Sequence, residues 1–296
     1  MSAVGSQGSC AKFSCLKGRR VFITGGATGI GASIVSAFAA QGAHVAFIDI
    51  AGEPAEALAN SLRHTKIWWS QCDVRDVRAL QRCIEYAAGV LRDFHVLVNN
   101  VADDERHELS AVTPEYWDER MAINQRPAFF AIQSAVPGMR PLGGGCTINV
   151  GSGGWQIKEG GYPAYAAAKA SMHGLTRGLV RVLGPDRIRI NTLSPGWTIT
   201  ERQKRWLTPE AKSELFRTQC LPNQIEPEDV ANFAVFLATD DARMCTGQEY
   251  KVDKAFRTNT ARYIAETQQE LPNWQQQDGG WPNKGWIAGQ EKGESN

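Results

Sequence analysis

The sequence predicts an α/β fold with one doubly wound domain, in which helices cover both faces of a parallel sheet. Short apolar runs typical of strands alternate with helical segments along most of the chain, and this alternation favours a parallel sheet. A glycine-rich turn follows the first strand, and polar residues follow several others. Because ligands bind outside the carboxyl ends of the strands in such sheets, we expect a ligand site at that edge.

The composition of the 296-residue chain is that of an ordinary globule, with 43% hydrophobic and 21% charged residues. A net charge of +1 does not favour nucleic acid or an acidic membrane as a partner. There is no apolar run long enough to cross a bilayer and no secretory signal. Seven scattered cysteines and five histidines without ligand spacing predict a reduced cytoplasmic protein with no metal site.

Three regions are predicted. Residues 1–15 form a flexible N-terminal leader, and 16–253 form the α/β domain. Residues 254–296 form a C-terminal extension that is rich in glutamine and poor in apolar residues outside its tryptophans. This composition predicts loose packing or disorder.

The first strand, over 21–24, leads into glycines 25, 29 and 31 and then into a helix whose apolar residues recur over 34–39. Strand, glycine turn and helix are the layout of a dinucleotide-binding unit. Glycine lets the backbone approach a pyrophosphate, and the helix N-terminus supplies amide donors.

The second strand, over 44–48, ends in Asp49. A carboxylate at this place can accept hydrogen bonds from both ribose hydroxyls of adenosine, and it would repel a 2′-phosphate. The neighbouring Ala27, Thr28 and Ile50 offer no basic group for that phosphate. The sequence therefore favours NAD over NADP.

Polar residues also end the next two strands: Asp73 closes the third, and Asn99 and Asn100 follow the fourth. A long helical stretch then contains Asn124, which either faces solvent or serves a polar task, since asparagine is an indifferent helix former. These elements are a strand over 67–74, a helix over 76–91, a strand over 94–98 and a helix over 115–136.

Tyr165 and Lys169 lie one helical turn apart, and Ser152 follows the predicted strand 146–150. A strand end can hold a serine hydroxyl against the tyrosine hydroxyl of the next helix. At ~4 Å and an effective dielectric of ~20, a lysine ammonium stabilises a phenolate by about 4 kcal/mol, or roughly three pKa units. Tyr165 is therefore either a candidate acid/base catalyst near neutral pH or, with Lys169, one of the solvated pairs that many helices have at this spacing.

The same helix has an apolar stripe and a second row of small residues at intervals of four. The small row either packs on the sheet of its own chain or forms a helix–helix interface between subunits. The stripe contains Met172, Leu175, Leu179 and Val182, and the row contains Ala166, Ala170, Gly174 and Gly178.

The last third of the chain completes the alternation. A polar segment over 201–225 is either a flap over the site or an ordinary surface excursion. The elements around it are a strand over 187–193, a helix over 227–238 and a strand over 248–252.

Taken together, these motifs resemble the short-chain dehydrogenase/reductase family in order and spacing over about residues 16–253. They are Thr24–Gly31, Asp73-Val74, Asn99–Ala102, Asn124, Ser152, Tyr165-x-x-x-Lys169 and Pro195-Gly196-x-x-x-Thr200. The resemblance implies a seven-stranded Rossmann-type sheet and an NAD(P)-dependent oxidoreductase that forms a homodimer or homotetramer.

It also implies roles for single residues. Tyr165 would be the acid/base, Lys169 would bind the nicotinamide ribose, and Ser152 would orient the reacting oxygen, with Asn124 holding a water. The implied cofactor contacts are Gly25, Thr28, Ile30 and Gly31 at the pyrophosphate, Asp49 at the adenosine ribose, Asp73 and Val74 at the adenine, Asn99 and Val101 at the other ribose, and Gly196, Thr198 and Thr200 at the nicotinamide. The sequence departs from the family at Asn-Asn-Val101-Ala102, where Asn-Asn-Ala-Gly is usual, and at Asp253-Lys-Ala-Phe, where Asp-Gly-Gly is usual.

Segments 112–124 and 240–250 resemble a subgroup that oxidises aldoses at C1, such as D-xylose, L-fucose or D-arabinose dehydrogenases. The charged run 103–107 is either the rim of a polar substrate pocket or a solvated loop. Trp155 could stack on a sugar face. We therefore expect oxidation of an aldose to its lactone with Tyr165 as general base. A dehydrogenase or reductase of a 3-hydroxyacyl compound or cyclic alcohol, and a non-catalytic nucleotide-binding protein, remain open.

Overall fold

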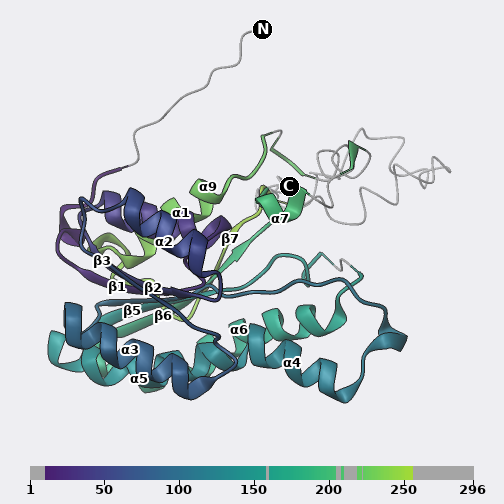
Figure 1. Cartoon of the computed structure of the whole chain (residues 1–296), viewed down its shortest axis with the longest axis horizontal. Helices are drawn as coiled ribbons and strands as arrows, with labels where there is room; N and C mark the ends of the chain where they lie inside the picture. The colour runs from purple at the N-terminus through teal and green to yellow at the C-terminus, as the bar shows by residue number, and fades with distance from the viewer. Residues whose placement is uncertain (1–10, 158–159, 205–207, 210–218, 222, 256–296) are drawn as a thin grey trace, which may run out of the picture.

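Seven parallel strands form a single sheet in the order β3-β2-β1-β4-β5-β6-β7 (Figure 1). The computed structural model describes residues 11–157, 160–204, 208–209, 219–221 and 223–255. The arrangement confirms the predicted doubly wound fold. The strands are β1 (Arg20–Thr24), β2 (His44–Asp49), β3 (Ile67–Gln71), β4 (Val96–Asn99), β5 (Gly145–Val150), β6 (Ile188–Pro195) and β7 (Glu249–Val252).

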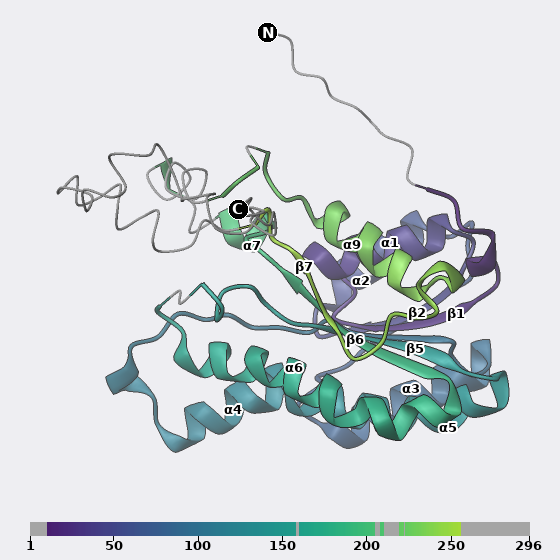
Figure 2. The same cartoon turned by 180° about the vertical axis from the view of Figure 1, so that it is seen from behind.

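Helices cover both faces of the sheet, as both views show (Figures 1 and 2). On one face lie α1 (Gly29–Ala40), α2 (Gly52–Ser61) and α9 (Pro227–Ala238). On the other lie α3 (Val77–Leu91), α4 (Pro114–Asn124), α5 (Arg126–Met139) and α6 (Pro163–Leu183). The short α7 (Glu201–Lys204) follows β6. In the described part of the chain no helix is both long and apolar enough to span a membrane.

Side chains of β1 show how the alternating pleat divides the core into two layers. Val21 and Ile23 pack with α1 and α9, whereas Phe22 packs on the opposite side with α3 and α5. Because both faces of the strand are buried, its sequence is continuously apolar, as is usual for central parallel strands. Helix α6 brings Met172 into the buried interior of the second face.

The strand order reverses between β1 and β4, which makes this point the switch of the doubly wound sheet. The register pairs Thr24 of β1 with Asn99 of β4, and Asn99 with Asn149 of β5. Three polar residues therefore lie at one level, at the last position of β1 and β4 and at the last but one of β5. The loops that leave this edge build the site described below.

Several helices begin where the sequence places capping residues. The carboxylate of Asp76 accepts a hydrogen bond from the Ala79 amide at the start of α3, 2.9 Å long. Thr113 Oγ1 accepts one from the Tyr116 amide at the start of α4, 3.2 Å long. Proline lies in the first turn of α4, α5, α6 and α9, where its missing N–H costs nothing because that donor has no partner in the helix.

The predicted single helix over 115–136 is wrong, because α4 ends at Asn124 and α5 begins at Arg126. Gln125 breaks the helix with φ −130° and ψ −57°. The Pro127 ring, which clashes with the carbonyl four residues earlier in a continuous helix, lies instead in the first turn of α5. The break leaves Asn124 at a helix end, where its side chain can turn toward a neighbouring loop.

Two smaller expectations also differ. The third strand ends at Gln71, so Asp73 lies in the loop beyond it. On α6 the predicted apolar stripe is too long, because Val182 is 61% exposed.

The row of small residues on α6 does not pack on the sheet, since Gly174 and Gly178 are exposed and a Cβ built on either meets nothing within 4 Å.

The domain contacts the chain before the predicted start at residue 16. The Phe13 amide donates a 2.9 Å hydrogen bond to Gln41 Oε1, and Phe13 and Cys15 pack against the core. Residues 1–10 of the predicted leader, most of the polar segment after Lys204 and nearly all of the C-terminal extension lie outside the described residues.

Candidate active site

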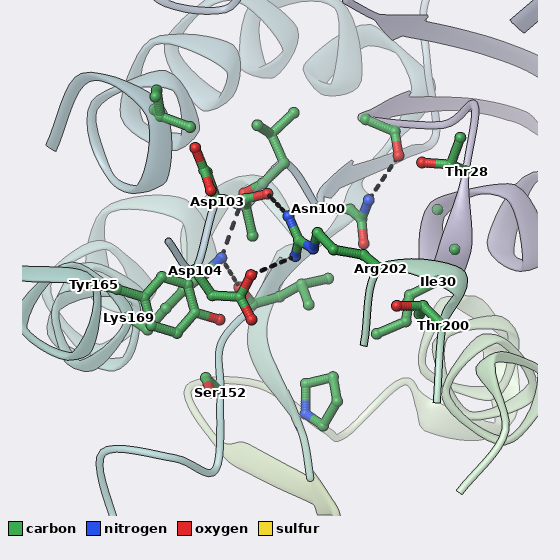
Figure 3. Close-up of a pocket in the computed structure, with 18 of the residues that line it drawn as sticks. Thr28, Ile30, Asn100, Asp103, Asp104, Ser152, Tyr165, Lys169, Thr200 and Arg202 are labelled. Carbon is green, nitrogen blue, oxygen red and sulfur yellow. Dashed lines mark hydrogen bonds and ion pairs between the residues drawn. The ribbon is translucent and has the colours of Figure 1, made fainter. Parts of the chain in front are cut away.

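A pocket of about 760 Å³ runs along the carboxyl edge of the sheet, from the glycine turn after β1 to the loop after β6 (Figure 3). It brings together most of the residues that the sequence singled out. Those are Gly25, Thr28, Ile30, Gly31, Asp49, Asp73, Val74, Val101, Ser152, Tyr165, Lys169, Gly196, Thr198 and Thr200. Three predicted residues, Asn99, Asn124 and Trp155, do not line it.

At one end, the glycine turn is closely folded against itself. Gly25 has φ +68°, a conformation that glycine adopts without strain. A Cβ on Gly31 would lie 1.8 Å from the Gly25 carbonyl oxygen, so only glycine fits there. The N-terminus of α1 therefore lies at this end of the pocket, which Thr28, Gly29 and Ile30 help to line.

Asp49 is held at the end of β2 by two backbone amides. Its Oδ2 accepts from the Ala27 amide and its Oδ1 from the Ala51 amide, both at 2.9 Å. These bonds orient the carboxylate and leave part of its acceptor capacity for a ligand. The adjacent Ile50 is 59% exposed and brings no charge to this end of the pocket.

Arg75 is a pocket residue that the sequence analysis missed. Its guanidinium donates hydrogen bonds from Nε and Nη2 to the Asp73 carboxylate, at distances of 2.6 to 3.0 Å, and from Nη1 to Glu119 Oε1 at 2.8 Å. The hydrogen bonds from Arg75 lower the pKa of Asp73 below its usual value. The basic side chain at this end is therefore already engaged by two carboxylates.

Tyr165 and Lys169 project from α6 toward the opposite end of the pocket, as predicted from their spacing (Figure 3). Tyr165 is 9% exposed and stacks edge-on against Tyr162, with ring centroids 5.1 Å apart. Ser152 lies in the loop after β5, where its Oγ accepts a 3.2 Å hydrogen bond from the Gly154 amide. The three side chains thus meet at one end of the pocket from two elements.

Lys169 is almost completely enclosed, with 2% of its surface exposed. Its ammonium donates to the carbonyl oxygens of Val150 at 2.9 Å and Val101 at 3.4 Å. Burial, and to a smaller extent repulsion by Arg202, lower the pKa of Lys169 to about 7, although attraction to Asp104 opposes the fall. The full positive charge that the sequence argument assumed is therefore only partly present at neutral pH.

Asn124 lies behind Lys169 rather than in the main pocket. Its Oδ1 accepts from the Asp103 amide at 2.8 Å, and its Nδ2 donates to the Asp103 and Arg120 carbonyl oxygens at 3.0 Å each. Asn124 and Lys169 border a second cavity of about 10 Å³, which is about the size needed for one water. Asn124 therefore anchors the loop after β4 and borders a space for a water.

Asn99 lies beneath the pocket, at 6% exposure, and its neighbour Asn100 takes the lining position. Asn99 Nδ2 donates to Asn149 Oδ1 at 2.9 Å, and Asn149 Nδ2 donates to Thr176 Oγ1 at 3.0 Å. This buried network joins β4 and β5 to the helix that holds Tyr165 and Lys169. No local pattern in the sequence reveals it, because its members come from distant segments.

The substrate end differs from expectation in its aromatic residue. Trp155 is half-buried outside the pocket wall, whereas Tyr162 and Trp197 line it. Arg106 lies over the Tyr162 ring, with Cζ 3.9 Å from the centroid. Of the charged run 103–107, Asp103, Asp104 and Arg106 line the pocket, so this run forms part of the rim rather than a fully solvated loop.

Comparisons with known proteins agree on one family. A family model described as enoyl-(acyl carrier protein) reductase matches residues 25–256. The chain is 44% identical to a D-xylose 1-dehydrogenase of Caulobacter vibrioides over 251 residues, which are 84% of this chain and 100% of that protein. It is 41% identical to a probable galactose dehydrogenase of Rhizobium meliloti over 247 residues, 82% of this chain and 96% of that protein.

Among solved structures, a blue fluorescent protein from a metagenomic library, in complex with NADPH, superposes with a TM-score of 0.76. It is 34% identical in sequence, and the match covers 81% of this chain and 98% of that one. Both sequence relatives are sugar dehydrogenases by name, and the structural relative is bound to NADPH. These findings agree with the dinucleotide-binding pocket that the sequence of this chain predicts.

Proposed function

The chain belongs to the short-chain dehydrogenase/reductase family of NAD(P)-dependent oxidoreductases, and on that premise we propose that it oxidises the C1 hydroxyl of an aldose to the lactone, with NAD as the preferred cofactor. The observation that carries this proposal is the likeness to a D-xylose 1-dehydrogenase over that protein's full length. The pocket supports the same proposal, because Ser152, Tyr165 and Lys169 all line it.

The described residues fit a dinucleotide along the length of the pocket. The glycine turn and the N-terminus of α1 line one end of the pocket, where the unpaired amides of the first helical turn would bind a pyrophosphate. Asp49 would hold the adenosine ribose, and Val74 would flank the adenine. Thr198 and Thr200 would contact the nicotinamide end. When bound, the cofactor supplies the acceptor for the hydride that leaves C1.

Proton removal falls to the chain's own residues. Tyr165 Oη would take the proton of the C1 hydroxyl as general base, and Ser152 Oγ would hold the same oxygen by a hydrogen bond. A positive charge on Lys169 favours the phenolate form of the tyrosine by electrostatic attraction. The water-sized cavity between Lys169 and Asn124 offers a route by which the proton can leave the buried end of the pocket.

The preference for NAD rests on Asp49. Its carboxylate would repel a 2′-phosphate, and Ile50 beside it is apolar. Arg75, the basic residue at this end, is bound to Asp73 and Glu119. We expect Asp49→Ser to weaken NAD and to improve the use of NADP relative to NAD by about tenfold or more.

The first experiment is a substrate panel scored by the formation of reduced cofactor with NAD and with NADP. Pentoses and hexoses should react, and the product should be a lactone that hydrolyses to the aldonic acid. A 3-hydroxyacyl ester and a cyclic alcohol represent the competing substrate classes, and preference for either would overturn the sugar assignment. Tyr165→Phe should bind NADH as the wild type does but lose at least about a hundredfold in kcat, and full activity in this variant would remove its role as base.

We also propose that the chain forms a homo-oligomer in the cytoplasm. Trp117 of α4 and Phe129 of α5 are each 41% exposed, and the small residues of α6 leave room for a close helix contact. A sedimentation run that shows only monomer would remove the first proposal, and cell fractionation tests the second.

A further inference from the structure

An acidic residue of the loop after β4 projects into the catalytic end of the pocket. Asp104 lines it, and its side chain is only 17% exposed. Figure 3 shows Asp104 beside Tyr165 and Lys169, with Arg202 reaching it from the opposite wall. This carboxylate therefore lies at the same end of the pocket as Tyr165 and Lys169.

Two residues of α7 hold Asp104 in place. Arg202 Nη2 lies 3.0 Å from Oδ1, and Gln203 Nε2 donates to Oδ2 at 2.7 Å. Arg202 Nη1 also donates to the Ala102 carbonyl oxygen at 3.1 Å. An ionised carboxylate offers about four acceptor positions, and these two partners occupy one on each oxygen. Asp104 can therefore accept further hydrogen bonds without releasing α7.

The side chain of the neighbouring Asp103 has different partners from that of Asp104. Its Oδ2 accepts from Arg120 Nη1 at 2.8 Å, and the side chain of Arg120 is 5% exposed. Asp103 is therefore tied to α4, while Asp104 is tied to α7 and to the pocket. Both carboxylates line the pocket, but they have different partners, and Asp104 is the one that lies beside Tyr165 (Figure 3).

We propose that Asp104 determines specificity by accepting hydrogen bonds from sugar hydroxyls other than the reacting one. This inference rests on the proposed oxidation of an aldose. A sugar whose C1 oxygen lies at Tyr165 and Ser152 presents its neighbouring hydroxyls a few ångströms away, within reach of a carboxylate at the same end of the pocket. An apolar alcohol leaves that carboxylate without compensation for lost water, and an acidic substrate is repelled by it. Asp104 thus selects neutral polyols.

A different role would be to anchor α7 alone. Removing Asp104 would then loosen the pocket for every substrate by the same factor. A recognition role predicts an effect that depends on which hydroxyl the substrate has. The two roles are therefore separated by pairing a change in the protein with a change in the sugar, as in a double-mutant cycle.

The experiment measures kcat/KM for D-xylose, D-galactose and their monodeoxy analogues at C2, C3 and C4, with the wild type and Asp104→Ala. In the wild type, loss of the recognised hydroxyl should lower kcat/KM about 10- to 100-fold, as expected for a hydrogen bond to a charged group. With Asp104→Ala, the kcat/KM values of the same deoxy sugar and its parent sugar should differ by less than about threefold. Arg202→Gln, which keeps the carboxylate, should retain the deoxy penalty.

Asp186→Asn removes a carboxylate that pairs with Arg140 on the surface and serves as the matched control. NADH binding and thermal unfolding show whether each variant is folded, and Asp104→Leu, which also removes both acceptor oxygens, provides the same comparison if the alanine variant fails. An equal deoxy penalty in wild type and variant, or no penalty in the wild type, overturns the inference. Absence of turnover with every aldose in the wild type would instead overturn the proposed function.

Discussion

Replacing Lys169 by methionine should make the cofactor-free protein more stable at neutral pH. The lysine is 2% exposed, and burial lowers its pKa from 10.5 to about 7. At about 1.4 kcal/mol for each pKa unit, enclosing this group costs about 5 kcal/mol at neutral pH. Methionine has a similar length and no charge, so it removes that cost. It also leaves the Val150 carbonyl oxygen without its donor, which costs about 1–3 kcal/mol.

The expected gain in the free energy of unfolding is therefore about 2–4 kcal/mol at neutral pH, and it should shrink as the pH rises. Above pH 10.5 the lysine is neutral in both the native and the unfolded chain. As the pH falls from 10.5 toward 7, the unfolded chain binds a proton that the native state does not, so the wild type loses stability. Near pH 9.5 only about 1–1.5 kcal/mol of the cost remains, and the lost hydrogen bond should cancel it.

Urea unfolding of wild type and variant at about pH 7 and about pH 9.5, without cofactor, measures this difference. Cofactor must be absent because any ligand that binds only the native state adds its own stabilisation. Lys251→Met, at an exposed position of β7, is the control for loss of a lysine that is not enclosed. The reasoning is refuted if Lys169→Met changes the free energy of unfolding equally at both pH values, or lowers it at pH 7.

Three other substitutions test the architecture of the site. Gly31→Ala should raise the Kd for NADH at least about tenfold and cost about 1–3 kcal/mol of stability, because its Cβ has no room. Gly89→Ala is the control, since a Cβ there meets nothing within 4 Å. This variant should be neutral or stabilising by up to about 1 kcal/mol. Arg120→Met should cost about 1–3 kcal/mol in urea unfolding, less than a fully buried pair, since its carboxylate partners Asp103, Glu105 and Glu119 are 40% to 58% exposed and can be rehydrated. No change would show that these ion pairs contribute nothing. Asn149→Leu should lower kcat more than it raises the KM for NAD, because its side-chain bonds hold β4 and α6 together, and steady-state kinetics that leave kcat unchanged would contradict this.

The fold could be predicted almost completely from local patterns. The strand 21–24, the glycines that follow it and the capped helices all have short-range signals, and a parallel order follows from their alternation. The helix over 115–136 was the main error, because a single helix was extended through the polar residues 124–126 and past Pro127, whereas the backbone turns at Gln125. The break leaves Asn124 at a helix end, where its side chain bonds to the loop after β4.

The sequence predicted only some of the residues that line the pocket. Tyr165 and Lys169 face the pocket together because a helical period places them there, and the same kind of local rule located Asp49 and Gly31. Trp155, by contrast, lies outside the pocket wall, since the direction of a loop side chain does not follow from its position in the sequence. Asp104 reaches α7, nearly a hundred residues away along the chain, through a contact that no periodicity encodes.

The sequence by itself therefore determined most of the elements, their order and the types of side chain that line the pocket. These depend on backbone propensity and residue type, which act over a few neighbours. The tertiary structure alone decided which carboxylate enters the pocket, which asparagine lies beneath it and how much charge Lys169 keeps. Those properties depend on burial and on partners from distant strands, and the free energy of a buried polar group is set by the atoms that enclose it.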